Sequence, residues 1–191
     1  MADSKKKSVK KVEKKTVEKA KVSGKKNPEK LTCGCEKTIK VPTGGQVIQY
    51  FTLTPALPTR TGRGDWIFSE VGEQSDISLL TVQFNENNSP LERALERAVL
   101  VISMNNDADA KGTWRFALGG VATDHADEDP SNDVITEVID NGFTLLIYVQ
   151  VLAEENKEQL PFGFMASFTD AVTGVVSIYE SQDPEIKPKR P

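Results

Sequence analysis

Runs of period-two or β-branched residues alternate with turn-forming residues along the chain from about residue 37 onward. Residues 37–41 alternate, 42–45 hold the turn-forming sequence Pro-Thr-Gly-Gly, and 46–54 (QVIQYFTLT) resume the strand pattern. Further strands are predicted at 66–68, 76–84, 98–104, 113–118, 134–139, 142–152, 162–168 and 175–179. Many short strands with loops between them favour a sandwich over a parallel α/β sheet. The sequence therefore predicts an all-β fold: a single antiparallel, jelly-roll-like β-sandwich over residues 37–180.

One segment interrupts this pattern and predicts a short helix. Residues 89–97 open with Ser89 and Pro90, which suit the N-cap and the first helical position, and two leucines follow one turn apart. The helix is expected to lead directly into the next strand. Residues 170–174 end in Gly174, where a tight β connection needs a positive φ, so they predict a hairpin turn.

Neither end of the chain carries the strand pattern. In residues 1–36 the apolar positions are sparse, and Val9, Val12 and Val17 do not maintain the i, i+3, i+4 spacing of a helix. Such a segment buries too little apolar surface to offset the entropy of ordering it, which predicts a flexible, disordered basic arm. Residues 181–191 are polar and contain several prolines, and we expect them to form an extended Pro/Lys tail outside the sandwich.

Charge divides the chain in the same way. Residues 1–40 contain 14 Lys and 5 acidic residues, a net charge of +9. The other 151 residues contain 10 Lys or Arg and 23 Asp or Glu, a net charge of −13, and +9 − 13 gives the −4 of the whole chain. The modest total therefore conceals a strongly polarised molecule.

The lysines of the arm are the candidate binding residues. They are Lys5, Lys6, Lys7, Lys10, Lys11, Lys14, Lys15, Lys19, Lys21, Lys25 and Lys26. Lysines attract phosphates without sequence preference, which predicts contact with nucleic acid or another polyanion. The arm could instead dock on the acidic body of a neighbouring copy, or simply keep the protein in solution. The arm has no Arg and no aromatic residue, and this counts against specific nucleic-acid recognition.

Composition argues against several protein classes. No apolar run approaches the roughly 20 residues of a transmembrane helix, and no apolar segment follows the basic start as in a signal peptide. We therefore expect no membrane contact, and a location in the cytoplasm or in a particle assembled there. The only cysteines form the sequence Cys33-Gly34-Cys35, which is too close for a disulfide framework and lacks the partners of a metal site. Ordinary thiols are expected there.

Catalytic signals are weak. The single histidine, His125, lies in the acidic segment 124–130, and the chain has no Gly-x-Ser-x-Gly elbow and no Gly-rich phosphate loop. That segment and 105–109 (NNDAD) carry the oxygen ligands of a calcium site, but neither follows the EF-hand order. The sequence predicts a protein that is not an enzyme and holds no cofactor or metal.

Short motifs near the C-terminus resemble the AidA/PixA-type bacterial inclusion-body protein family. The matching positions are Phe162-Gly163-Phe164, Asp170, Gly174, Tyr179 and Ser181-Gln182-Asp183-Pro184-Glu185-Ile186, with Gly64-Asp65-Trp66-Ile67-Phe68 earlier in the chain. Gln182 stands where the family has Trp, and the lysine arm replaces the family's opening strand. The resemblance implies a β-sandwich that self-assembles and has no known enzymatic activity.

These observations predict a non-enzymatic structural or assembly protein. Its β domain would associate with copies of itself, and its arm would contact polyanions or acidic neighbouring subunits, as in a coat or capsid protein. One alternative is a bacterial inclusion-body or stress-related protein. Another is a small-molecule or carbohydrate-binding module, which would place Trp66 or Trp114 in an exposed pocket.

Overall fold

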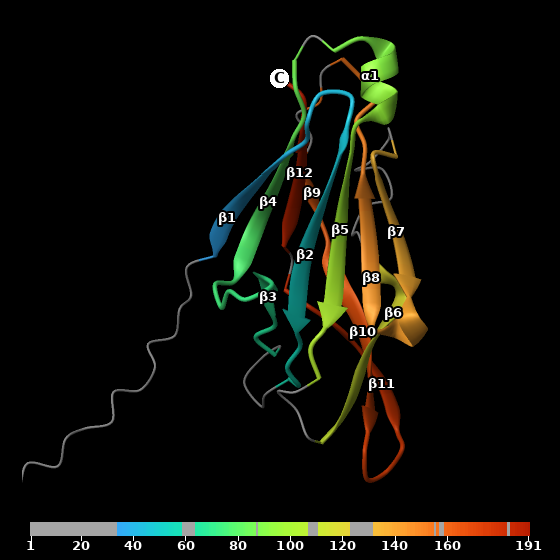
Figure 1. Cartoon of the computed structure of the whole chain (residues 1–191). Coiled ribbons are helices and arrows are strands. Elements are labelled where there is room, and N and C mark those ends of the chain that lie inside the picture. The colour runs from blue at the N-terminus through green and yellow to red at the C-terminus, as the bar shows by residue number, and fades with distance from the viewer. Residues whose placement is uncertain are drawn as a thin grey trace, which may run out of the picture. The chain divides into compact units, whose positions relative to one another are not determined.

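The structure, a computed structural model, describes residues 34–58, 64–86, 88–106, 111–122, 132–154, 156, 159–182 and 184–191. The described residues form three sheets (Figure 1). In spatial order, the five-stranded sheet contains β3 (Ile67–Glu70), β2 (Gln46–Thr54), β5 (Arg97–Met104), β8 (Thr144–Val149) and β7 (Val134–Ile139). The four-stranded sheet contains β1 (Cys35–Lys40), β4 (Ile77–Gln83), β12 (Glu185–Lys189) and β9 (Leu160–Pro161). The three-stranded sheet contains β11 (Val176–Glu180), β10 (Gly163–Asp170) and β6 (Gly112–Ala122).

The sheets pack as two layers. Only Phe162 separates β9 from β10, so the four-stranded and three-stranded sheets adjoin, and the five-stranded sheet lies opposite them. Figure 1 shows β2, β5 and β8 in front of β12 and β9. The predicted all-β sandwich with one short helix is confirmed. The sheets are mixed, however, because β1–β4, β4–β12 and β2–β5 run parallel.

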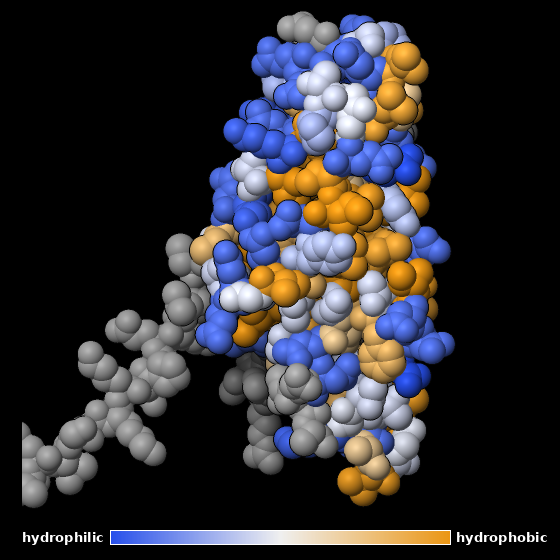
Figure 2. All heavy atoms as spheres, viewed as in Figure 1, coloured by the Kyte–Doolittle hydropathy of each residue, from blue (hydrophilic) through white to orange (hydrophobic). Residues whose placement is uncertain are grey.

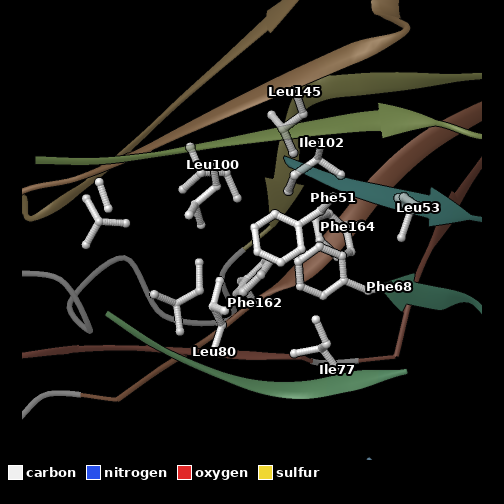
Figure 3. Packing of buried hydrophobic residues seen from close by; sticks show 14 of the residues in the cluster. Phe51, Leu53, Phe68, Ile77, Leu80, Leu100, Ile102, Leu145, Phe162 and Phe164 are labelled. Atoms are coloured by element: carbon white, nitrogen blue, oxygen red, sulfur yellow. The ribbon is translucent and has the colours of Figure 1, made fainter. Parts of the chain in front are cut away.

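The core lies between the layers (Figure 3). Alternate residues of the central strands point inward and are buried, which is the period-two pattern expected of a sheet with one face on the core. From the five-stranded sheet these are Phe51, Leu53, Leu100, Ile102, Leu145 and Ile147. The opposite layer contributes Ile77, Leu80 and Phe164, and in β4 a register shift after Ile77 interrupts the alternation. Phe68 bridges two of the aromatic rings, with centroids 5.0 Å from Phe51 and 5.2 Å from Phe164. Such aromatic contacts add to the stability gained from burial.

The predicted helix is confirmed as α1 (Pro90–Leu95). The Ser89 hydroxyl accepts a hydrogen bond from the Glu92 backbone N–H (3.3 Å), and the Glu92 carboxylate accepts one from the Ser89 N–H (2.7 Å). This reciprocal pair is a capping box, which satisfies two of the free N–H groups at a helix start. The helix buries none of its residues, so its sequence signal was its cap rather than an apolar stripe.

The predicted hairpin is also confirmed. β10 and β11 pair antiparallel across a turn in which Gly174 has a φ of 69°. The Asp170 carboxylate accepts hydrogen bonds from the backbone N–H groups of Thr173 (2.7 Å) and Val172 (2.9 Å) and from the Thr173 hydroxyl. These bonds, chiefly those from Thr173, favour the charged carboxylate and lower the pKa of Asp170.

The prediction that residues 181–191 form a tail outside the sandwich is wrong. β12 pairs with β4 and β9, and Ile186 is buried in the core. The domain also begins slightly earlier than residue 37, because β1 starts at Cys35. A short polar strand gives little pattern of its own, since its place depends on the neighbours that it pairs with. A small helical turn, η1 (Asp140–Gly142), connects β7 to β8.

A buried ion pair holds the C-terminal end in place. The Arg190 guanidinium donates to the Glu96 carboxylate (2.7 Å), and both side chains are almost completely buried. It also donates to the carbonyls of Asn85 (2.7 Å) and Val151 (3.0 Å), and lies 5.2 Å from the centre of the Phe84 ring. Because a buried charge without partners is costly, this network links the last residues to the start of β5.

Candidate interaction surface

The outer side of the five-stranded sheet, which faces away from the core, is apolar across four strands. Strand register places its side chains in two cross-strand rows. The first row is Ile48, Val99, Tyr148 and Ile135, and the second is Tyr50, Val101 and Leu146, with Glu137 at its end. We call the seven apolar residues of these rows the outer face. All are at least partly exposed, and Tyr50 has 57% of its surface in contact with solvent.

Polar residues border the outer face on both sides along the strands. The next row toward α1 contains Gln46 and Arg97, and the row at the other side contains Thr52, Ser103 and Thr144. Figure 2 shows hydrophobic side chains gathered over β2, β5 and β8, with hydrophilic ones around them. An apolar centre with a polar border is the composition of protein–protein interfaces. An apolar patch exposed on a soluble domain commonly marks a contact site.

A pocket of about 330 Å³ adjoins this face beside α1. Its lining residues are Arg97, Asn132, Asp133, Ile135, Tyr148, Gln150 and Leu152. The Arg97 guanidinium donates to the Gln150 side-chain oxygen (3.3 Å) and lies 6.0 Å from the centre of the Tyr148 ring. The Tyr148 hydroxyl donates to the Glu137 carboxylate (3.4 Å). The pocket therefore presents hydrogen-bonding groups next to an apolar surface.

A second, smaller pocket of about 70 Å³ includes Trp66 in its lining. Trp66 is 5% exposed and donates its ring N–H to the Ala56 carbonyl (3.0 Å). Trp114 is fully buried, and its ring packs edge-on against Trp66 with centroids 5.5 Å apart. Both tryptophans are core residues, so neither forms the exposed stacking platform that the binding-module alternative needs.

Most of the residues selected from the sequence lie outside the described ranges. All eleven candidate lysines fall within residues 1–33, as does Cys33, and His125 falls within 123–131. Cys35 is the first residue of β1 and is exposed. The lysine hypothesis therefore stays a prediction.

The candidate calcium segment at 105–109 is described only in part. The Asn106 side chain accepts a hydrogen bond from the Trp114 N–H (2.6 Å) and donates one to the Trp114 carbonyl (3.2 Å). Asn106 thus fastens the start of β6 to the end of β5. Within the described ranges no three His, Cys, Asp or Glu side chains gather as metal ligands do, and no helix is long and apolar enough to span a membrane.

Sequence reasoning missed the outer face, although its signal is present. In the segments 46–54 and 98–104, apolar residues occupy consecutive positions, as in Tyr50-Phe51 and Val99-Leu100-Val101. Consecutive apolar residues in a strand supply both sides of a sheet, a pattern usually associated with strands buried on both faces. Here the described residues cover only one of the two sides.

Comparison with known proteins identifies a family. The family model described as the DP-EP family matches residues 35–190. The matched range begins at the first residue of β1 and ends at Arg190, so it includes every strand of the sandwich. No match was found among curated proteins.

Proposed function

The chain belongs to the DP-EP family, and we propose that it is a non-enzymatic assembly protein whose copies associate through the outer face of the five-stranded sheet. The observation that supports this most directly is the pair of apolar rows across four strands. Ile48, Tyr50 and Ile135 each expose more than half of their surface. Covering such side chains releases roughly 25 cal/mol for each Å² of apolar surface removed from water.

The charge of the body favours this face over the rest of its surface for contact between copies. Residues 41–191 carry a net charge of −13, so two bodies repel each other over most of their surface. The outer face contains no charged residue, and its borders hold one cation, Arg97, and one anion, Glu137. Two copies can therefore approach here with little repulsion between like charges.

The basic arm supplies the second part of the proposal. Residues 1–40 carry +9, and an arm on one copy attracts the acidic body of the next. The same lysines would also attract nucleic acid, which gives the coat-like form of the proposal. The two forms differ in the nucleic acid content of the purified particle.

A bacterial inclusion-body protein is the second candidate. It is supported by the resemblance to the AidA/PixA-type family, whose matching residues fall in the β10–β11 hairpin, at the start of β12 and at the start of β3. The inclusion-body candidate predicts a large particle with a protein-only absorbance spectrum. The coat-like candidate predicts a particle that co-purifies with nucleic acid.

The test is the molar mass of the full chain and of two double variants, measured by light scattering after size exclusion. Ile48→Asp with Tyr50→Asp places two negative charges on the outer face at exposed positions. We expect the natural chain to associate and this variant to lose the contact through the outer face, so that its molar mass falls below that of the natural chain. Both variants should stay folded, because exposed side chains contribute little to the stability of a single copy.

The matched control is Leu91→Asp with Leu118→Asp. These leucines are 72% and 70% exposed and lie outside the outer face, on α1 and β6. The control should associate like the natural chain. A natural chain that is monomeric at all concentrations, or a control that dissociates as fully as the outer-face variant, contradicts the proposal.

A further inference from the structure

Strand β11 offers a second contact, along the side of the three-stranded sheet where no described strand pairs with it. The Asp170 N–H donates to the Val175 carbonyl (3.0 Å), and the Ser181 N–H donates to the Phe164 carbonyl (2.9 Å). In an antiparallel pair only every second residue hydrogen-bonds across the ladder. Residues 175, 177, 179 and 181 therefore bond to β10, and the backbone groups of Val176, Ile178 and Glu180 point away from it.

The side chains of the same residues are exposed. Val176 and Ile178 have 60% and 52% of their surface in solvent, whereas Tyr179 packs inward with its ring centroid 5.4 Å from that of Trp114. Among the described residues, β10 is the strand that pairs with β11. Figure 1 shows the β10–β11 hairpin reaching the far end of the domain from α1. The edge thus presents backbone donors, backbone acceptors and two apolar side chains together.

The other outermost strands are protected from pairing with a further strand. Half of the six residues of β1 are charged, namely Glu36, Lys37 and Lys40. β3 has only four residues, and β9 has two, one of which is a proline. β6 and β7 lie beside each other, and β7 carries Glu137 among its central residues. Charged residues and short length are the usual means by which proteins prevent edge strands from associating. β11 has neither Lys nor Pro, and its one charge, Glu180, is at its end.

We propose that β11 pairs antiparallel with β11 of a second copy, about a two-fold axis at Ile178. This inference deepens the proposed self-assembly by adding a second contact between copies. The register follows from the backbone: centring the pair on Ile178 places Val176 opposite the partner's Glu180. Every outward-pointing residue of one strand then meets an outward-pointing residue of the other, which is the hydrogen-bonded position of an antiparallel pair.

The side chains suit the same register. Ile178 lies beside its own copy, and each Val176 lies opposite a Glu180, so no like charges are directly opposed. A shift by two residues removes one of the three hydrogen-bonded pairs within the strand. A shift by one residue sets outward-pointing groups against residues whose backbone is already bonded to β10. The backbone directions and the side chains of β11 therefore define a single register for the pairing.

Two different two-fold contacts on one chain have a consequence for the assembly. The outer face lies on the five-stranded sheet, and the β11 edge belongs to the opposite layer. A copy that uses both contacts joins two neighbours, so that copies can add repeatedly instead of stopping at a dimer. The β11 contact would thus turn pairs of sandwiches into larger particles.

The test uses Ile178→Pro in the full chain, alone and with the outer-face double variant. Proline removes the outward-pointing N–H of residue 178, which makes no bond to β10, and proline is tolerated on edge strands for that reason. Ile178→Lys is the second edge variant, and Val172→Lys, at the 92% exposed turn, is the matched control. Molar mass is measured by light scattering, and residue-level amide exchange is followed on dilution.

We expect Ile178→Pro to reduce the assembly to dimers held by the outer face, and the outer-face variant to leave dimers held by β11. The combined variant should be monomeric. In the natural chain, the amides of Val176 and Ile178 should be protected at high concentration and lose that protection on dilution. A folded Ile178→Pro and a folded Ile178→Lys that both assemble like the natural chain overturn the inference.

The two proposals fail in different ways. If the outer-face variant is monomeric while the Val176 and Ile178 amides are never protected, the β11 contact is absent and the outer-face proposal stands. If Ile178→Pro is monomeric and the outer-face variant matches the natural chain, the β11 contact stands and the outer-face proposal fails.

Discussion

The two sides of the five-stranded sheet are both apolar, yet only one is covered by described residues. Phe51 and Tyr50 are neighbours on β2 and illustrate the difference, since Phe51 is completely buried and Tyr50 is 57% exposed. The inner side packs against β4 and β10, whereas the outer side faces solvent. Sheets of this kind usually place polar residues on the solvent side. The departure from that pattern is the observation on which the proposed contact between copies rests.

The first prediction contrasts these two neighbours and has the largest expected effect. Phe51→Ala should lower the free energy of unfolding by about 3–5 kcal/mol, because it leaves a cavity among packed aromatic rings. Tyr50→Ala should change it by less than about 1 kcal/mol in a monomeric background, because its side chain is exposed there. Urea unfolding monitored by tryptophan fluorescence measures both. Equal losses from the two substitutions would show that both sides contribute to the core.

The second prediction concerns the buried ion pair between Arg190 and Glu96. Arg190→Ala should cost about 3–5 kcal/mol of folding free energy, because it leaves the Glu96 carboxylate buried without its cation. Lys187→Ala, at a partly exposed position on the same strand, is the control and should cost far less. Thermal unfolding of the two variants measures the difference. If both variants have the same melting temperature as the natural chain, the ion pair does not hold the C-terminal end in place.

The third prediction concerns the arm, and its expected effect is smaller than those of the first two. Deleting residues 1–30 removes twelve lysines and four acidic residues, a net loss of eight positive charges, and should weaken association without abolishing it. Association of the natural chain should also weaken as the salt concentration rises, since exposed charges are screened by ions. Association of the deleted chain should depend less on salt. Sedimentation velocity at low and high salt measures both. An identical salt response in the two chains would remove the role of the arm.

The fourth prediction is the smallest and concerns the hairpin that carries β11. Hydrogen bonds from Thr173 and Val172 lower the pKa of Asp170 in the folded chain. A lowered pKa means that the charged carboxylate stabilises the turn above its ordinary pKa of about 3.9, and that this contribution is lost as pH falls through the lower folded value. The pKa of Asp170 is measured by following the NMR signal of its carboxyl carbon as a function of pH. A midpoint at or above about 3.9 would contradict the turn geometry.

The sequence predicted the parts of the fold that depend on local pattern. Strands β2 and β5 follow from runs rich in β-branched residues, α1 from Ser89 and Pro90, and the β10–β11 turn from Gly174. It did not predict β12, in which Ile186 is the only strongly apolar residue. Pro188 argues against a central strand. The structure accommodates this proline because β12 pairs with β9 only at residues 185 and 186.

The candidate surface was harder to predict than the fold. Which strands become neighbours depends on contacts between distant segments, and the parallel pairing of β2 with β5 is one such contact. Without that neighbour relation, Tyr50 and Val101 are separate apolar residues rather than two members of one row. The lysine arm was visible at once, because charge needs no partner to be counted, but its target depends on another molecule.

Hydroxyl-radical labelling of the full chain at several concentrations tests the central claim most directly, because it reads the accessibility of single side chains. At high concentration Tyr50 and Tyr148 should be protected, and on dilution their labelling should rise toward that of an exposed residue. Leu91, which is 72% exposed on α1, should label at a constant rate throughout. Labelling of Tyr50 and Tyr148 that is independent of concentration, in a chain that nevertheless associates, would contradict the assignment of the outer face as the contact between copies.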